Sequence, residues 1–359
     1  MLILGIETSC DETSAAVVEE TGDPLRPWAI RSNIIASQVA IHREWGGVVP
    51  ELASRQHLRD ICGVAERALE DGRAAWTDLG AVAVTQGPGL VGSLLVGVAF
   101  AKAAAAAARL PIVAVHHLAG HIESLALQNG ELPLPAVVLV VSGGHTSLYL
   151  VERPGHYQLL SRTRDDAAGE AYDKVARLLG LGYPGGPAID RLARLGDDRA
   201  VPLPATRLTH VDRNAPELKG DLDFSFSGLK TAVAHYIKGS GAVFGSGDAQ
   251  AIAENGSRPL YDICASFQRV VVKTLVDRTF DAARRYGAKS VGVAGGVSAN
   301  SRLREEFKTR GETREVPTFV PSLQLSTDNA AMIAAAGLRK LRAGIVSTLD
   351  FNADASLLL

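Results

Sequence analysis

A chain of 359 residues is long enough for two packed domains. Hydrophobic residues make up 47% of it and charged residues 21%, a mixture that can form both a buried core and a solvated surface. Aromatic residues make up only 5%. The core must therefore consist mainly of Ala, Val, Leu and Ile, which favours the α/β class. The net charge of −2 excludes a strong overall attraction to nucleic acid, so RNA binding would need a local basic patch or a partner.

The first predicted element is a β-hairpin, with strands over Leu2–Ile6 and Ser14–Val18 around the polar turn Glu7–Thr13. A second strand–turn–strand is expected over 136–151, around the turn Ser142–Thr146. Two apolar strands around a small polar turn, repeated about 135 residues later, indicate a duplicated α/β unit. Each turn offers backbone N–H groups and hydroxyls to a polyanion.

A strand–loop–helix–strand unit is expected between the hairpins, over Ala81–Val84, Gln86–Gly92, Leu94–Arg109 and Ile112–Val115. Its loop, residues 87–92, matches G-x-G-x-x-G, but a dinucleotide site also requires an acidic residue after the next strand. His116 and His117 stand there instead. We therefore interpret the glycines as a tight turn before a packed helix.

The longest apolar stretch, Leu90–Leu110, contains Lys102 and is dominated by alanine, which predicts a buried core helix rather than a membrane span. The N-terminus enters a strand pattern directly, without the features of a signal peptide. The cysteines are odd in number, far apart and form no CxxC pair, which argues for a reducing compartment; they are Cys10, Cys62 and Cys264. We expect a cytoplasmic protein with no membrane partner.

Later in the chain, a strand, paired glycines and a helix start are expected over Val291–Asn300. A helix over Thr327–Leu341 would carry Asp328 in its first turn, where negative charge suits the helix dipole. Loop chemistry near residues 120–135 suggests the domain boundary. We expect an N-terminal α/β domain over 1–125, on which 327–359 packs back, and a C-terminal α/β domain over 126–326 with an insertion at about 203–259.

His117 and His121 stand four residues apart, which places them on one side of a helix and lets both imidazoles reach one metal ion. The zinc peptidase motif requires Glu directly after the first His, and Leu118 occupies that place. A lone H-x-x-x-H pattern leaves an alternative open, namely two half-buried histidines at a helix start.

The turn Ser142–Thr146 follows a fully apolar run, Val137–Val141, which predicts a strand buried on both faces. Polar groups at the end of such a strand stand where ligands commonly bind in α/β folds, although an ordinary hairpin loop is the alternative. The acidic stretch Asp165–Lys174 is typical of a solvated helix N-terminus. The glycines and prolines of Gly180–Pro187 indicate a close backbone turn whose purpose spacing alone leaves open.

Taken together, nine segments spread in order over nearly the whole chain resemble the tRNA N6-adenosine threonylcarbamoyltransferase family of bacterial type, formerly described as glycoproteases or O-sialoglycoprotein endopeptidases. They are Glu7–Ser14, Trp45–Arg55, His116–His121, Val141–Thr146, Gly169–Lys174, Tyr183–Pro187, Phe224–Lys230, Gly295–Asn300 and Ser326–Met332. The resemblance implies an actin/Hsp70/sugar-kinase-like fold, two duplicated α/β domains with a ligand cleft between them.

The resemblance also implies the site residues. His117, His121 and Asp328 would hold one divalent metal ion per subunit, iron, with zinc as the alternative. Two imidazoles and a carboxylate with open positions suit a catalytic metal. The implied contacts to threonylcarbamoyl-adenylate are Val140, Val141, Ser142, Gly143, Gly144, Asp173, Gly186, Asp190 and Asn300.

The implied activity is transfer of the threonylcarbamoyl group from threonylcarbamoyl-adenylate to N6 of the adenosine 3′-adjacent to the anticodon in tRNAs reading ANN codons, with release of AMP. Our hypothesis is that Asp11 or Glu12 positions the amine or accepts its proton, with His145 as the alternative base. The implied partners are tRNA, a smaller degenerate paralogue and a P-loop ATPase.

Three other classes of protein remain as alternatives. An ATPase or kinase of the same fold would bind Mg²⁺, which prefers oxygen ligands to the two histidines. A metallopeptidase lacks its Glu general base beside His117. A non-catalytic scaffold would not be expected to carry His117, His121, Asp328 and both glycine-containing turns.

Overall fold

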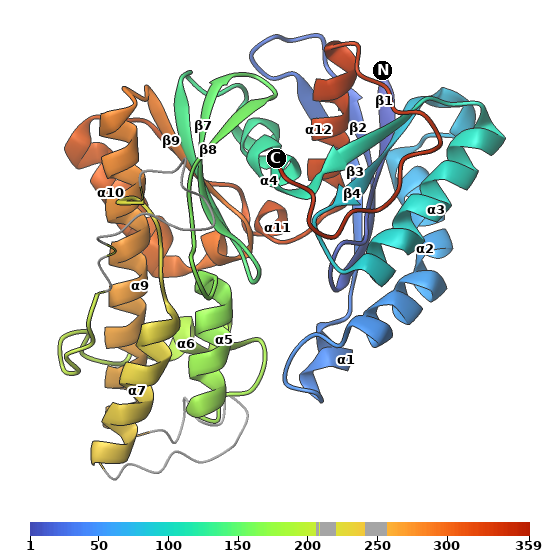
Figure 1. Ribbon diagram of the computed structural model, residues 1–359. Helices are drawn as coiled ribbons and strands as arrows, with labels where there is room; N and C mark the ends of the chain where they lie inside the picture. The colour runs from blue at the N-terminus through green and yellow to red at the C-terminus, as the bar shows by residue number, and fades with distance from the viewer. Residues whose placement is uncertain (206–207, 209–219, 241–256) are drawn as a thin grey trace. The chain divides into compact units, whose positions relative to one another are not determined.

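The computed structural model describes residues 1–205, 208, 220–240 and 257–359 (Figure 1). The chain forms two compact units. Unit 1 comprises Met1–Pro133, Val151–Tyr157 and Pro321–Leu359, and unit 2 comprises Leu134–Leu150 and Gln158–Val320. The chain first passes from unit 1 to unit 2 at Pro133/Leu134, where the sequence analysis expected 125/126, and it crosses again at 150/151, 157/158 and 320/321.

Unit 1 is built on a five-stranded sheet in the order β3-β2-β1-β4-β5. The first three strands are antiparallel neighbours, and β4 and β5 continue the sheet in parallel. Glu7 pairs with Ser14, so the first hairpin forms as predicted. The strands are β1 (Leu2–Glu7), β2 (Glu12–Glu20), β3 (Trp28–Ser37), β4 (Leu79–Gly87) and β5 (Ile112–His116).

Helices cover both faces of the unit 1 sheet, because alternate strand residues point to opposite sides. Leu4 and Ile6 pack with the core residues of α2 and α3, whereas Ile3 packs with those of α12. A Cβ on Gly5 would lie 2.3 Å from the Ala330 carbonyl oxygen, so this glycine permits the close approach of α12. The helices are α1 (Val39–Arg43), α2 (Pro50–Gly72), the 3₁₀ turn η1 (Trp76–Asp78), α3 (Val91–Ala108), α4 (His117–Asn129), α11 (Leu323–Ser326) and α12 (Ala330–Arg342).

Helix α3 is long and apolar enough to cross a membrane by length and composition, and one such helix is weak evidence for a span. It packs one face into the core through Leu94, Val98 and Ala101, while Val91 and Leu95 are exposed on the other. Only 33% of the helix is buried, so the expectation of a buried core helix holds for one face. The alanines explain this, because they fit closely against the sheet and tolerate solvent equally well.

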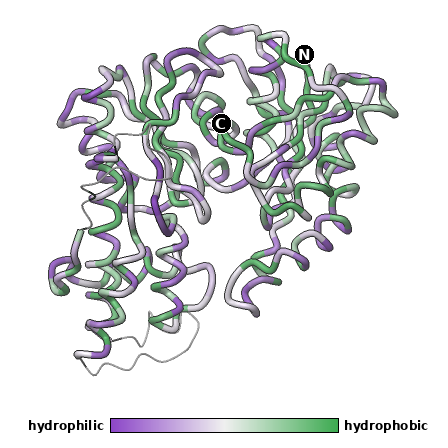
Figure 2. Tube along the Cα trace, in the orientation of Figure 1, coloured by the Kyte–Doolittle hydropathy of each residue, from purple (hydrophilic) through white to green (hydrophobic). Residues whose placement is uncertain are grey.

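Unit 2 repeats the topology of unit 1. Its sheet has the order β10-β9-β6-β7-β8, in which β6 takes the central place of β1, and β9 and β10 are the parallel strands. The predicted duplication of an α/β unit is thereby confirmed. Hydrophobic residues concentrate along the central strands of both units (Figure 2). The strands are β6 (Ala136–Val141), β7 (Thr146–Arg153), β8 (His156–Arg162), β9 (Ser290–Ala294) and β10 (Thr318–Phe319).

One large hydrophobic core holds unit 2 together, centred on the long helix α9, whose Phe267 packs edge-on against Tyr172 of α5. Most of the insertion expected at about 203–259 lies outside the described residues, but Ser227–Ser240 within it forms helix α7. The helices are α5 (Ala168–Leu178), α6 (Gly185–Ala193), α7 (Ser227–Ser240), α9 (Arg258–Arg285), the 3₁₀ turn η2 (Gly296–Ala299) and α10 (Ser301–Arg314).

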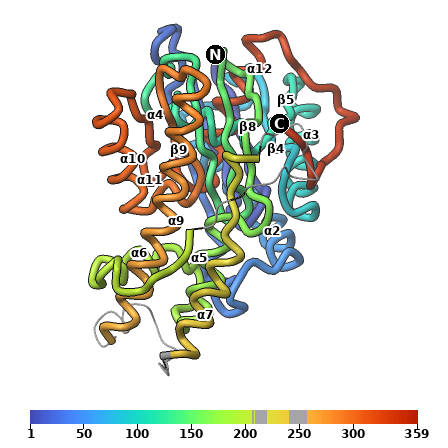
Figure 3. Tube along the Cα trace, turned by 60° about the vertical axis from the view of Figure 1, so that its left-hand side comes forward, coloured from blue at the N-terminus to red at the C-terminus, as the bar shows by residue number. Residues whose placement is uncertain are grey.

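The C-terminal segment after α12 returns along unit 1 beside β5 and α3 (Figure 3). The Ser347 N–H donates to the Ile112 carbonyl, and the Asp354 N–H donates to the Gln86 carbonyl, each at 2.9 Å. This segment therefore lies against the loop between β4 and α3, next to the start of α4.

Candidate metal centre and substrate site

The two histidines of the predicted metal site lie on the first two turns of α4. His116 ends β5 and caps α4, because its Nδ1 accepts a hydrogen bond from the Leu118 N–H at 3.1 Å. The helix then begins at His117, and one turn later His121 lies on the same side. Both imidazoles are buried, and His121 is fully inaccessible. The helix and the shared face predicted from their spacing are confirmed.

Asp328 lies just before α12 rather than in its first turn. Asn329 is the cap of that helix, with its side-chain oxygen accepting from the Met332 N–H at 3.1 Å, so the helix begins at Ala330. The predicted helix start at Thr327 is therefore wrong. Because Asp328 precedes the cap residue, helical geometry does not fix the direction of its side chain. Its carboxylate contacts His121 of α4.

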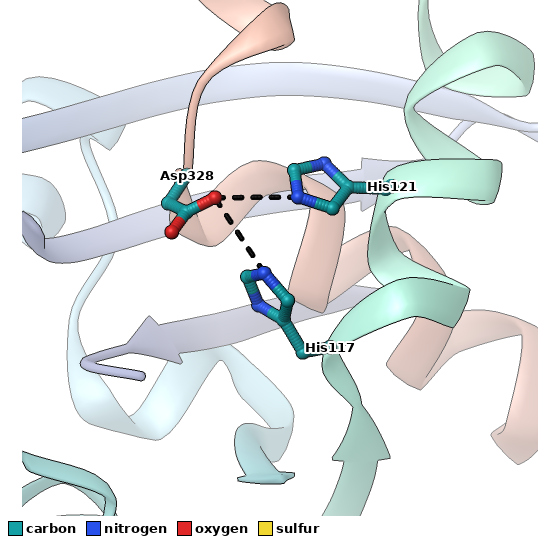
Figure 4. A group of neighbouring side chains, drawn as sticks. All are labelled: His117, His121 and Asp328. Carbon is teal, nitrogen blue, oxygen red and sulfur yellow. Dashed lines mark ion pairs between the residues drawn. The ribbon is translucent and has the colours of Figure 1, made fainter. Parts of the chain in front are cut away.

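The structure brings these three side chains together (Figure 4). Asp328 Oδ1 lies 3.2 Å from His121 Nε2 and 3.5 Å from His117 Nε2, and all three potential ligand atoms lie within 4.8 Å of one another. Neither ring nitrogen of His121 makes an aligned hydrogen bond to the described part of the chain. A buried polar atom without such a bond is costly, and a metal ion would satisfy it. Two imidazoles and one carboxylate can hold a divalent metal.

A fourth buried side chain, Glu7, supports this cluster and was missed by the sequence analysis. Its Oε2 lies 3.0 Å from His117 Nδ1 and accepts from Thr85 Oγ1 at 2.7 Å. Burial disfavours the imidazolium of His117, but the carboxylates of Asp328 and Glu7 outweigh it and raise the pKa of His117 to about 9. Burial lowers the pKa of His121. One feature of the sequence could have pointed to Glu7: it is an acidic residue directly after an apolar strand, a position that the fold buries.

The first turn also carries Asp11 and Glu12. Burial raises the pKa of Asp11, and it raises that of Glu12 to about 8, with the Asp328 carboxylate adding to both shifts. Glu12 Oε1 accepts from Ser37 Oγ at 2.8 Å, while its buried Oε2 has no hydrogen-bond partner among the described residues. A carboxyl group with a pKa near neutrality is suited to proton transfer.

His57 of α2 holds this turn in place. Its Nε2 lies 3.0 Å from the Cys10 carbonyl oxygen and donates to it, while Nδ1 lies 2.7 Å from Thr13 Oγ1 and 3.3 Å from Gln38 Nε2, from which it accepts. The ring must be neutral to make these bonds, and burial lowers the pKa of His57 accordingly. The turn therefore has a rigid support outside the metal cluster.

The glycines of the G-x-G-x-x-G match serve packing. A Cβ on Gly89 would lie 2.5 Å from the Ser9 carbonyl oxygen, and one on Gly87 would collide with the Asp354 carbonyl of the C-terminal segment. The Leu90 N–H donates to the Ser9 carbonyl at 2.8 Å. The loop therefore supports the first turn, in agreement with the expected tight turn before a packed helix.

The second turn, in unit 2, is open. Gly143 and Gly144 are exposed, and a Cβ on either would meet no described atom within 4 Å. Ser142 closes the turn, since its N–H donates to the His145 carbonyl at 2.8 Å and its Oγ accepts from the His145 N–H at 3.2 Å. Among the described residues of unit 2, no contact requires glycine at these two positions, so a ligand could approach their backbone. Val140 and Val141 are fully buried in β6 and position the turn.

The remaining predicted substrate residues of unit 2 take part in hydrogen bonds within the protein. Asp173 Oδ1 accepts from the Gly185 N–H at 2.7 Å, which places it beside Gly186. Asp190 stands one turn after Gly186 on α6, and its Oδ1 accepts from Gln268 Nε2 at 3.1 Å. A second residue bound to Asp190 is Ser301, whose Oγ donates to Oδ1 at 2.8 Å.

Gln268 joins Asp190 to Asn300. The Asn300 amide donates to Gln268 Oε1 at 2.8 Å, and its own oxygen caps α10 by accepting from the Leu303 N–H at 2.9 Å. Gln268, which sequence analysis missed, is buried in the middle of α9 and gave no local signal. A hollow of about 720 Å³ in unit 2 borders this network at Gln268 and Ser301, and it does not include the second turn.

The structure thus places the predicted residues in three groups. His117, His121 and Asp328 form one cluster in unit 1, with Asp11 and Glu12 in the turn nearby. Unit 2 holds the second turn with His145, and it holds the α6 network separately.

The solved structures that this chain resembles define the class of fold. Component A of (R)-2-hydroxyglutaryl-CoA dehydratase from Acidaminococcus fermentans matches 96% of this chain and 99% of that one, with a TM-score of 0.50 at 15% identity. Full-length HypF in its phosphate- and nucleotide-bound form matches 95% of this chain and 46% of that one, with a TM-score of 0.56 at 14% identity. Together with the repeated sheet topology, these neighbours define an α/β protein of the actin/Hsp70/sugar-kinase class.

Sequence comparison identifies the family within that class. The TsaD family model, tRNA N6-adenosine threonylcarbamoyltransferase, matches residues 29–335. Proteins of that name from Moorella thermoacetica and Koribacter versatilis are 49% and 46% identical, over 98% and 100% of this chain and 95% and 99% of theirs. The chain belongs to the tRNA N6-adenosine threonylcarbamoyltransferase family and is a transferase.

Proposed function

We propose that this protein modifies tRNA by transferring a threonylcarbamoyl group from threonylcarbamoyl-adenylate to N6 of the adenosine 3′-adjacent to the anticodon, in tRNAs reading ANN codons. Membership of the family supports the reaction class. The observation that carries the proposal within the structure is the buried cluster of His117, His121 and Asp328, which fits one divalent metal ion. Iron is the metal we propose, with zinc as the alternative, because imidazole suits both.

The chemistry explains why activation and charge stabilisation are needed. The adenine N6 amine is a poor nucleophile, so the carbamoyl carbon must arrive as a mixed anhydride with AMP. The amine nitrogen forms a bond to that carbon, the carbon–oxygen bond to the phosphate breaks, and AMP leaves with the electron pair. A divalent ion bound at the cluster would supply Lewis acidity toward the phosphate.

Side chains and backbone groups of the chain would perform the remaining tasks. The N–H groups of the exposed residues Gly143 and Gly144 would donate to the carbamoyl oxygen as it gains negative charge. Glu12 or Asp11 would accept the proton released by the amine, and His145 is the alternative base. Burial raises the pKa of Glu12 to about 8, so the group holds a proton near neutral pH; positive charge nearby, such as a bound metal ion, would lower this pKa and leave a carboxylate that can accept the proton. Asp173, Gly186, Asp190 and Asn300 would line the adenylate site.

We also propose that the protein works in the cytoplasm with a smaller degenerate paralogue and a P-loop ATPase. The net charge of −2 leaves a single chain poorly suited to hold tRNA alone. The exposed apolar residues Val91 and Leu95 of α3, together with Leu58 on the neighbouring α2, suit a protein partner. An ATPase or kinase activity is less well supported, because the two histidines are poor ligands for Mg²⁺.

The test is single-turnover transfer from synthetic threonylcarbamoyl-adenylate to unmodified tRNA decoding ANN codons, with the partner proteins present. The wild-type protein should form modified adenosine, and His117→Ala should form little. The matched control is His156→Ala, an exposed histidine on β8, which should behave as wild type. Absence of product from folded wild type with all partners would contradict the proposed reaction.

A further inference from the structure

Among the described residues, Glu7 is the acidic side chain that contacts a predicted metal ligand on the side away from Asp328. It is fully buried at the end of β1, where an unpaired carboxylate would be very costly. Its Oε1 accepts from the Ser9 N–H, and its Oε2 accepts from Thr85 Oγ1 and lies 3.0 Å from His117 Nδ1. The fold therefore surrounds this carboxylate with donors at both oxygens.

These contacts determine which nitrogen of His117 keeps its proton when the ring is neutral, as it must be to bind a metal ion. A carboxylate accepts only, so Nδ1 must be the donor in the contact with Glu7 Oε2. Ser9 Oγ, at 3.2 Å from the same nitrogen, is a second partner on that side of the ring. The lone pair of Nε2 is then directed at the other side, where Asp328 Oδ1 lies at 3.5 Å. This orientation is the one that a metal ligand requires.

The two histidines of the cluster differ in the hydrogen bonds that orient their rings. Neither nitrogen of His121 makes an aligned hydrogen bond to the described residues, and the carboxylate beside it is that of Asp328, 3.2 Å from Nε2, so no described carboxylate holds Nδ1 as Glu7 holds that of His117. The rings meet edge-on, with centroids 4.7 Å apart, and the orientation of His117 therefore also limits that of His121. Glu7 therefore contacts His117 directly and affects His121 only through the contact between the two rings.

We propose that Glu7 is a positioning residue for the metal site: it holds His117 as the Nδ1–H tautomer with Nε2 directed at the ion. This inference rests on the proposed function only in taking His117, His121 and Asp328 as metal ligands. It adds to that function a residue whose role is to set metal affinity without touching the metal or the substrates.

The proposal explains why a carboxylate, rather than an amide, occupies this position. The Ser9 N–H requires an acceptor at one oxygen and His117 Nδ1–H requires an acceptor at the other. Glutamine supplies one acceptor and one NH₂ donor, so one of the two contacts must become donor-to-donor. If the NH₂ group faces His117, the ring must move its proton to Nε2, which removes the lone pair that would bind the metal.

The experiment compares Glu7→Gln with Thr85→Val in the full-length protein, stripped of metal and titrated with Zn²⁺ against a competing chelator. Loss of a carboxylate behind a ligating histidine typically weakens metal binding about 10- to 100-fold, which is the expected change for Glu7→Gln. Thr85→Val removes a hydrogen bond to the same buried carboxylate but leaves the acceptor for His117, so its change should be less than about threefold. Equal Zn²⁺ affinity for Glu7→Gln and wild type would overturn the proposal.

A second measurement remains decisive even if the Glu7 variant does not fold. Long-range ¹H–¹⁵N spectra of zinc-loaded wild-type protein report the tautomer of each histidine, and His117 should be protonated at Nδ1 and bound through Nε2. The opposite tautomer would overturn the proposal. Both readouts concern metal binding, so an inactive wild type that passes them would refute the proposed reaction while leaving the role of Glu7 standing.

Discussion

The two units contain the same strand–turn–strand at the centre of the same sheet, yet the two turns are built in opposite ways. The first turn is held by its neighbours: His57 binds the Cys10 carbonyl, Gly89 lies against Ser9, and Glu7 is fully buried. In the second turn Gly143 and Gly144 are exposed, and a Cβ on either would meet no described atom within 4 Å. A repeated fold element can thus serve either as a rigid support for ligating side chains or as an open backbone site.

The largest effect should come from the cluster beside the first turn. His121→Ala removes one of three ligands, so the protein should lose stoichiometric metal, and single-turnover transfer should fall by about 10²- to 10³-fold, since Lewis acidity is worth several kcal/mol. Metal analysis of the purified protein and the transfer assay measure the two effects. Full activity in a metal-free His121→Ala protein would show that the cluster plays no part in the reaction.

The two turns can be compared directly by giving each one a methyl group. Gly89→Ala should lower the free energy of unfolding by about 1–3 kcal/mol, because its Cβ would collide with the Ser9 carbonyl. Gly144→Ala should change stability by less than about 0.5 kcal/mol. It should nevertheless lower kcat/KM for the adenylate by about tenfold, because the methyl group hinders approach to the backbone N–H groups, whereas complete loss of such a donor costs about 10²- to 10³-fold. Denaturant unfolding and the transfer assay test the pair, and reversed results would refute the contrast.

The buried carboxyl of the first turn should make stability depend on pH. The pKa of Glu12 is raised from 4.5 to about 8, so the folded state holds a proton that the unfolded state releases between these values. Stability is therefore lost as pH rises through this window. In metal-free protein Glu12→Gln should be more stable than wild type by about 1–3 kcal/mol at pH 8.5, with the gain shrinking toward pH 5. Glu51→Gln, at an exposed position of α2, is the control and should show no such trend.

The smallest effect concerns the network in unit 2. Asn300→Ala removes the cap of α10 and the contact to Gln268, and should cost about 1 kcal/mol, seen as faster hydrogen exchange of the α10 amides. Asn300→Asp retains the cap oxygen and should cost less for that helix. Equal exchange rates in wild type and Asn300→Ala would show that the cap contributes nothing to the order of α10.

Much of this architecture follows from local patterns. Apolar runs bounded by polar turns predicted both hairpins, and their similarity predicted the duplication that the two sheets show. The interval between His117 and His121 determined their shared face, because side-chain direction along a helix depends only on the helical repeat. The predicted start of the last helix failed because Asn329, rather than an earlier residue, supplies the cap oxygen.

Only the tertiary structure decided what surrounds these elements. Asp328 is separated from His121 by the whole of unit 2 in sequence, and folding of the chain's last part onto α4 brings the carboxylate within 3.2 Å. The contact of Glu7 with His117, and the link from Asp190 through Gln268 to Asn300, depend in the same way on packing between distant elements. The sequence by itself determined the elements and the residues that share a face, because these depend on neighbours along the chain. The contacts between residues on different helices and strands depend on how the apolar faces of those elements pack. The spacing of residues along the chain does not contain that information.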